Sequence, residues 1–137
     1  MRPSIPTASL LAALALGACG SDASDAESTV STAVAALARG DAETACERLT
    51  PAAERSMLVR LRDNPLLPSI TARTCEEGVT KLHAKLSKTV LAVLEDGEVG
   101  EAKVDGDNAT VPVVGAGVKV RLRKQDDTWY IVGGFFD

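Results

Sequence analysis

The chain has 137 residues, of which 45% are hydrophobic, 25% are charged and 3% are aromatic. This balance is typical of one globular domain and argues against a disordered or membrane-spanning protein. The net charge is −4, and no run of basic residues is long enough to suggest a nucleic acid as partner, since phosphate binding depends on clustered Lys and Arg.

The N-terminus has the parts of a bacterial signal peptide. Arg2 supplies a positive start, and Ser9–Leu16 is an uncharged apolar segment, too short for the roughly 20 residues that span a bilayer. The stretch Leu16-Gly17-Ala18-Cys19 resembles the lipobox of bacterial lipoproteins, in which two small residues precede the cysteine that becomes the new N-terminus. The resemblance implies that residues 1–18 are removed and that the Cys19 thiol takes a diacylglyceryl group with acyl chains such as palmitate. An ordinary signal peptide or a buried helix with a coincidental cysteine is the alternative.

Lipid on Cys19 would decide where the protein resides. Each buried methylene contributes about 0.8 kcal/mol, and two acyl chains hold a protein stably where one holds it only marginally. We therefore expect a lipid-anchored protein on the extracytoplasmic face of a bacterial membrane. Residues 19–28 are rich in Gly, Ser and Asp and are expected to form a flexible tether, followed by a single domain over residues 29–137.

The other two cysteines, Cys46 and Cys75, are expected to form a disulfide. Export places them in an oxidising compartment, and with Cys19 lipidated only one pairing remains. The bond would close a loop of 29 residues (75 − 46) and contribute about 3.5 kcal/mol on the chain-entropy model. Two free structural thiols, or a cysteine nucleophile served by a histidine, are the alternatives. No metal site is expected, because zinc needs close Cys or His pairs and the chain has no CxxC and one His.

Caps and breakers predict three helices before residue 64. Ser24 with Glu27 fits a capping box, and apolar residues recur at helical spacing from there until Gly40. Asp41 can cap a short second helix. Thr50-Pro51 predicts the start of a third, with Thr as cap and Pro in the first helical position.

A fourth, longer helix is expected after the proline-containing loop 64–68. Thr74 and Glu77 form a second capping box, and the helix should end near Asp96-Gly97. Apolar residues along it recur at steps of three and four: Cys75, Val79, Leu82, Leu86, Val90 and Val93.

The hydrophobic period then changes from 3.6 to 2, which predicts strands. Turns are expected at 104–108, 115–117 and 125–128, and the last strand over Trp129–Phe136. Pro112 indicates an edge or irregular strand. Inward-facing positions should be Ala109, Val111 and Val113 in one strand and Val118, Val120 and Leu122 in the next, where Lys119, Arg121 and Arg123 face water.

The predicted helices come first along the chain and the predicted hairpins follow. This order predicts an α+β fold, with the N-terminal helices packed on one face of a curved, C-terminal antiparallel sheet. In this arrangement the stripe of the fourth helix should face the inward residues of the sheet across one core. The contact expected is that of Val79, Leu82, Leu86 and Val90 with Val118, Val120 and Leu122.

Several short stretches, taken in their order and spacing, resemble a family of bacterial envelope lipoproteins of unknown function. The stretches are Gly40-Asp41, Ala45-Cys46, residues 49–52 (LTPA), Cys75, residues 104–113 (VDGDNATVPV) and residues 127–131 (DTWYI). That family is similar to the nuclear transport factor two-like, cystatin-like cone fold. The resemblance implies a long helix cradled by a bent antiparallel sheet, cysteines that tie helices together and, in some members, a pocket at the open end of the cone. It implies no activity, because the superfamily includes isomerases, dehydratases and members that only bind or scaffold.

No catalytic motif is present, neither a GxSxG turn nor a glycine-rich phosphate loop. The only histidine, His83, borders the apolar stripe, and we interpret it as a boundary residue satisfied by a backbone carbonyl or water. We therefore expect no catalytic residue and no cofactor, and a module that binds another envelope protein or contributes structurally. The alternative is a carrier or sensor of a small apolar ligand, in a pocket formed by Leu82, His83, Leu86, Val120 and Trp129. An isomerase- or dehydratase-like enzyme that uses His83 or a carboxylate facing the cone is a third hypothesis.

Overall fold

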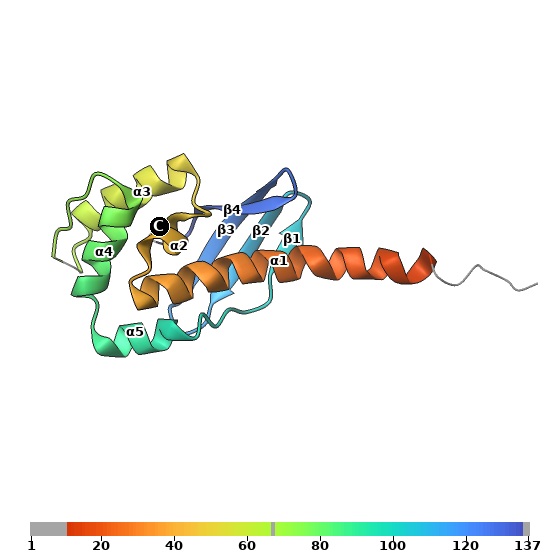
Figure 1. The fold of residues 1–137 in the computed structure, drawn as a ribbon, viewed down its shortest axis with the longest axis horizontal. Coiled ribbons are helices and arrows are strands. Elements are labelled where there is room, and N and C mark those ends of the chain that lie inside the picture. Colours follow the sequence, from red (N-terminus) through yellow and green to blue (C-terminus); the bar gives the residue numbers. More distant parts are fainter. Residues whose placement is uncertain (1–10, 67, 136–137) are drawn as a thin grey trace, which may run out of the picture.

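The computed structural model describes residues 11–66 and 68–135, with side chains from residue 21 onward. In these ranges helices precede strands, and the helices pack onto a four-stranded antiparallel sheet, so the α+β class is confirmed (Figure 1). The elements are α1 (Leu11–Arg39), α2 (Ala42–Cys46), α3 (Pro51–Asp63), α4 (Cys75–Lys85), α5 (Lys88–Glu95), β1 (Lys103–Asp105), β2 (Asn108–Val113), β3 (Val118–Gln125) and β4 (Thr128–Gly133).

Three of the predicted helix caps form. The side chains of Asp41, Thr50 and Thr74 each accept a hydrogen bond from the backbone N–H three residues later, at 3.2–3.3 Å. These bonds satisfy donors that the first turn of a helix leaves without partners, which is why α2, α3 and α4 begin where the sequence predicts.

The sheet is a meander with strand order β1-β2-β3-β4. Burial alternates along β2 and β3 as predicted, and Asp126 and Asp127 adopt positive φ angles of 49° and 60° in the two-residue turn before β4. Pro112 lies on an inner strand but beyond the end of the short β1, which pairs only with residues 108–110. The last strand is shorter than predicted, because it ends at Gly133, and Phe136 lies outside the described residues.

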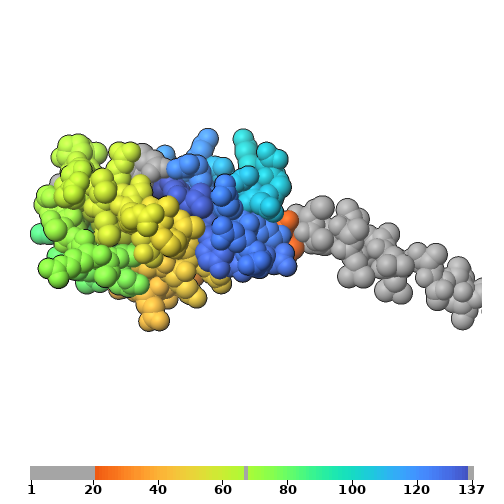
Figure 2. Space-filling view, turned by 90° about the horizontal axis from the view of Figure 1, so that it is seen from above, coloured from red at the N-terminus to blue at the C-terminus, as the bar shows by residue number. Residues whose placement is uncertain are grey.

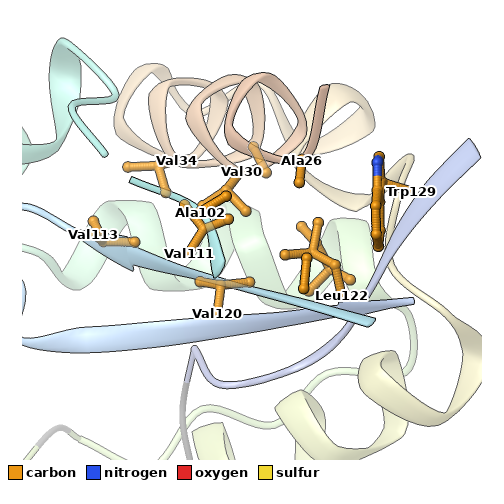
Figure 3. Packing of buried hydrophobic residues seen from close by; sticks show 12 residues of the cluster. Ala26, Val30, Val34, Ala102, Val111, Val113, Val120, Leu122 and Trp129 are labelled. Atoms are coloured by element: carbon orange, nitrogen blue, oxygen red, sulfur yellow. The ribbon is translucent and has the colours of Figure 1, made fainter. Parts of the chain in front are cut away.

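Helix α1 covers the inner face of the sheet. Figure 3 shows Ala26, Val30 and Val34 pointing from α1 toward the strand residues Val120 and Leu122. Together these residues form what we call the sheet cluster, which also contains Ala33, Ala102, Ala109, Val111, Val113, Trp129 and Ile131. Small residues on α1 allow the helix to lie close to the strands.

The predicted contact of the fourth helix with Val120 and Leu122 is wrong, because these two residues pack against α1 in the sheet cluster. Val79 and Leu82 of α4 pack instead against α2 and α3, in a second group of buried residues that we call the helix cluster. It contains Ala36, Ala45, Cys46, Met57, Leu61, Ile70, Cys75, Val79 and Leu82. Because α1 already covers the inner face of the sheet, the apolar side of α4 packs against other helices.

The single long helix expected from residue 75 to 96 is two helices. Leu86 is extended, with φ −73° and ψ 141°, and Ser87 starts α5 by accepting a hydrogen bond from the N–H of Val90 at 3.2 Å. The apolar spacing continues across this break, so it predicted one helix. As a result α5 lies along α1 instead of extending α4 (Figure 1).

The expected tether also differs, because residues 19–28 belong to α1 and Ser24 is not a cap. Ala26 is 0% exposed, and the N–H of Ala102 donates to Glu27 Oε1 at 3.0 Å. Lys124 Nζ reaches Asp22 Oδ1 at 2.7 Å. Ala23 and Ala26 continue the apolar stripe of Val30 at helical spacing, so a segment that is polar in composition still has one buried face.

Candidate functional site

An apolar groove lies between α1, α4, α5 and the turn that joins β2 to β3. Its volume is about 140 Å³, and every residue that lines it is apolar. We call it the α5 groove. The lining residues are Val34, Leu37, Leu82, Leu86, Val90, Leu94, Val113, Ala116, Val118 and Phe135.

Exposed valines extend this apolar surface beyond the groove. Val90 and Val93 of α5 are 41% and 46% exposed, and Val114 in the adjoining turn is 43% exposed. A methyl group added at Gly115 would lie 2.8 Å from Val93, so α5 and the turn are in direct contact. Helix α5 consists mainly of apolar residues, yet none of them is buried. A contiguous exposed apolar surface of this kind marks binding sites more often than isolated apolar residues do.

The structure brings together only part of the predicted pocket. Leu82 and Leu86 line the α5 groove, but Val120 and Trp129 are buried in the sheet cluster and do not. The reason is the placement of α1, whose residues pack with Val120 and Trp129 in the sheet cluster. Sequence analysis missed the contributions of α1 and of Ala116, although Ser87 was recognisable as the helix cap that turns α5 toward them.

His83 lies outside the groove lining, at the end of α1. Its Nδ1 is 3.2 Å from the carbonyl oxygen of Leu37, and since that oxygen only accepts, Nδ1 is the donor. The ring also covers Gly40, where an added Cβ would lie 3.0 Å from His83 Cδ2. The imidazole therefore packs on the turn after α1, and the hydrogen bond it makes there is to a backbone carbonyl.

No charged side chain lines the groove. Among residues 21–66 and 68–135 no polar or charged residue is buried, and no three His, Cys, Asp or Glu side chains are grouped to hold a metal ion. Hydrogen bonding to Lys81, and then to the N–H of Arg73, lowers the pKa of Glu77, while hydrogen bonding to Asp22 raises the pKa of Lys124. Each shift belongs to a surface contact that holds a helix in place.

The predicted disulfide between Cys46 and Cys75 is confirmed, with the two Cα atoms 6.1 Å apart. It joins the end of α2 to the start of α4 within the helix cluster. Both sulfur atoms are used in this bond, so neither is a thiolate available for nucleophilic chemistry.

Family models, curated proteins and solved structures provide no match to this chain. Within the part of the chain that the structure describes, no helix combines the length and the hydropathy needed to cross a membrane.

Proposed function

We propose that this chain is a lipid-anchored protein on the extracytoplasmic face of a bacterial membrane, where it binds another envelope protein without catalysing a reaction. The α5 groove and the valines beside it carry the binding part of this proposal. The signal-peptide pattern and the lipobox ending at Cys19 support the anchor.

The volume of the groove favours a protein partner over a metabolite. Small-molecule sites usually have volumes of about 300–1,000 Å³ and several converging polar groups. At about 140 Å³ with an apolar lining, the groove has room for one or two apolar side chains of a partner. The exposed Val93 and Val114, next to the half-exposed Val90 of the lining, would then form the surrounding contact surface.

The same geometry argues against catalysis. General acid–base chemistry needs a titratable group within hydrogen-bond reach of the reacting atoms. The groove is lined by apolar side chains alone, and His83 packs on Gly40 instead of lining it.

The anchor is tested by Cys19→Ser. Because acylation needs the thiol of Cys19, the variant should lose membrane retention, measured by fractionation of cells and by intact-protein mass. A Cys19→Ser protein that still fractionates with membranes and is released only by detergent would show that the lipobox interpretation is wrong.

The groove is tested with a photo-crosslinking residue at position 93 in the lipidated protein. Position 59 is the matched control, because Val59 on α3 is similarly exposed, at 48%, but lies outside the groove. We expect an adduct with one defined envelope protein from position 93 and none from position 59. Ala116→Phe, which fills the groove, should abolish the adduct while the far-UV circular dichroism is unchanged. Identical adducts from both positions would contradict the proposal.

A small apolar ligand is the second candidate, and the wholly apolar lining favours it. A cavity of about 150 Å³ can hold a benzene ring, so such a ligand would be about one ring in size. Native mass spectrometry of the purified protein would show it as an added mass that Ala116→Phe removes.

A further inference from the structure

The start of α1 is held firmly against the sheet, close to the proposed lipidation site. Asp22 forms an ion pair with Lys124 at 2.7 Å, and Lys124 lies near the end of β3. One turn further on, Ala26 is fully buried, and Glu27 accepts a hydrogen bond from the N–H of Ala102 just before β1. Figure 2 shows the red-orange residues that follow residue 20 lying against the blue β3–β4 hairpin.

The topology of the sheet places the groove at the opposite end. In an antiparallel meander the β1–β2 and β3–β4 turns lie at one end of the sheet, and the β2–β3 turn lies at the other. Lys124, near the end of β3, lies at the first end, and Ala116 of the groove, between β2 and β3, lies at the second. The eight residues of β3 separate the two ends by about 25 Å.

We propose that the lipid holds the β1–β2 and β3–β4 turns directly at the bilayer surface, and that the α5 groove is presented at the end of the domain away from the membrane. This inference rests on the lipidation of Cys19 proposed above. Cys19 precedes Asp22 by three residues, which in a helix is about 5 Å. The lipid and the folded domain are thus joined by less than one helical turn.

A flexible tether would behave differently. Ten residues of Gly- and Ser-rich chain have a root-mean-square length of about 18 Å and impose no orientation. The contacts of Asp22, Ala26 and Glu27 remove this freedom, because each fixes α1 to the sheet within about 12 Å of the anchor along the helix.

The charge of the anchored end gives no electrostatic attraction to an anionic bilayer. The two turns expose Asp105, Asp107, Asp126 and Asp127, which anionic headgroups would repel. Vesicles of phosphatidylcholine, which carry no net charge, therefore give the cleanest measurement.

The experiment uses the lipidated protein, purified from membranes and reconstituted in phosphatidylcholine vesicles that contain an acceptor dye on the lipid headgroup. Donor dyes are attached under non-reducing conditions to Asp107→Cys, in the β1–β2 turn, or to Val114→Cys, in the β2–β3 turn. We expect stronger energy transfer from position 107 than from position 114. A ten-residue Gly-Ser insertion between Gly20 and Ser21 should remove this difference while flotation with the vesicles is retained.

The outcomes separate the two proposals. Protein that does not float with vesicles has no lipid anchor, which overturns the lipidation and the orientation together. Protein that floats but gives equal transfer from positions 107 and 114, with or without the insertion, overturns the orientation alone.

Discussion

His83 closes the C-terminal end of α1. The imidazole donates to the carbonyl oxygen of Leu37 and covers Gly40, whose φ of +74° suits a residue without a Cβ. The Leu37 carbonyl oxygen also accepts from the N–H of Gly40 at 3.1 Å, so His83 adds a second donor there and ties α4 to the end of α1.

From this contact we predict that His83→Gln costs at most about 1 kcal/mol, the contribution of one hydrogen bond. A glutamine amide can donate to the same carbonyl oxygen, so the loss should be small. The free energy of unfolding in urea measures it, and rescue of any phenotype of a deletion strain measures the effect on function. A folded, lipidated His83→Gln protein that fails to rescue the phenotype would contradict a non-catalytic role and favour the isomerase-like hypothesis.

At this scale the sequence predicted much of the structure, because the interactions involved are local. The caps at Asp41, Thr50 and Thr74 each join residues three positions apart, so a single window of sequence contains both partners. The contact between His83 and Leu37 joins residues 46 positions apart, and only the class of its partner, a backbone carbonyl or water, was expected. Neither Leu37 nor Gly40 was identifiable, since both depend on how α1 and α4 pack.

At the scale of elements, the break between α4 and α5 decides the site. The pattern of apolar residues runs through Leu86 without interruption, and helical periodicity alone cannot show that a helix stops and restarts on the same face. Ser87 provides the physical reason, because its side chain offers the N–H of Val90 a partner outside a continuous helix. The turn lets α4 pack on α2 and α3 while α5 follows α1, and the α5 groove opens between them.

The disulfide connects two of these elements, and its removal should loosen α2 from α4. Closing a 29-residue loop contributes about 3.5 kcal/mol. Reducing agent should therefore lower the thermal midpoint by about 10 °C or more. The Cys46→Ala/Cys75→Ala double variant is the control, and its midpoint should be low and insensitive to reductant. Equal midpoints with and without reductant in the parent protein would show that the bond contributes little.

At the scale of the whole molecule, α1 is the element that joins the two groups of buried residues. Val30 and Val34 belong to the sheet cluster, and Ala36, on the same helix, belongs to the helix cluster. The sequence predicted the α+β class and the inward residues of the sheet, but assigned the covering helix incorrectly. A hydrophobic stripe shows which face of a helix is buried and not which element covers it. The alanines of α1 made its stripe less conspicuous than the stripe of Val79 and Leu82.

Because α1 spans both groups and Leu49 packs against each of them, we predict that the domain unfolds in one cooperative transition. Leu61 in the helix cluster and Leu122 in the sheet cluster are 0% and 1% exposed, so Leu61→Ala and Leu122→Ala should each cost about 2–5 kcal/mol.

Trp129, the only tryptophan, lies in the sheet cluster, and its fluorescence reports on that cluster while far-UV circular dichroism follows all the helices. The two signals should change at the same urea concentration in the parent protein and in both variants. If Leu61→Ala lowered the midpoint of the helical signal and left the midpoint of Trp129 fluorescence unchanged, the two clusters would be separate folding units, and α1 would not couple them.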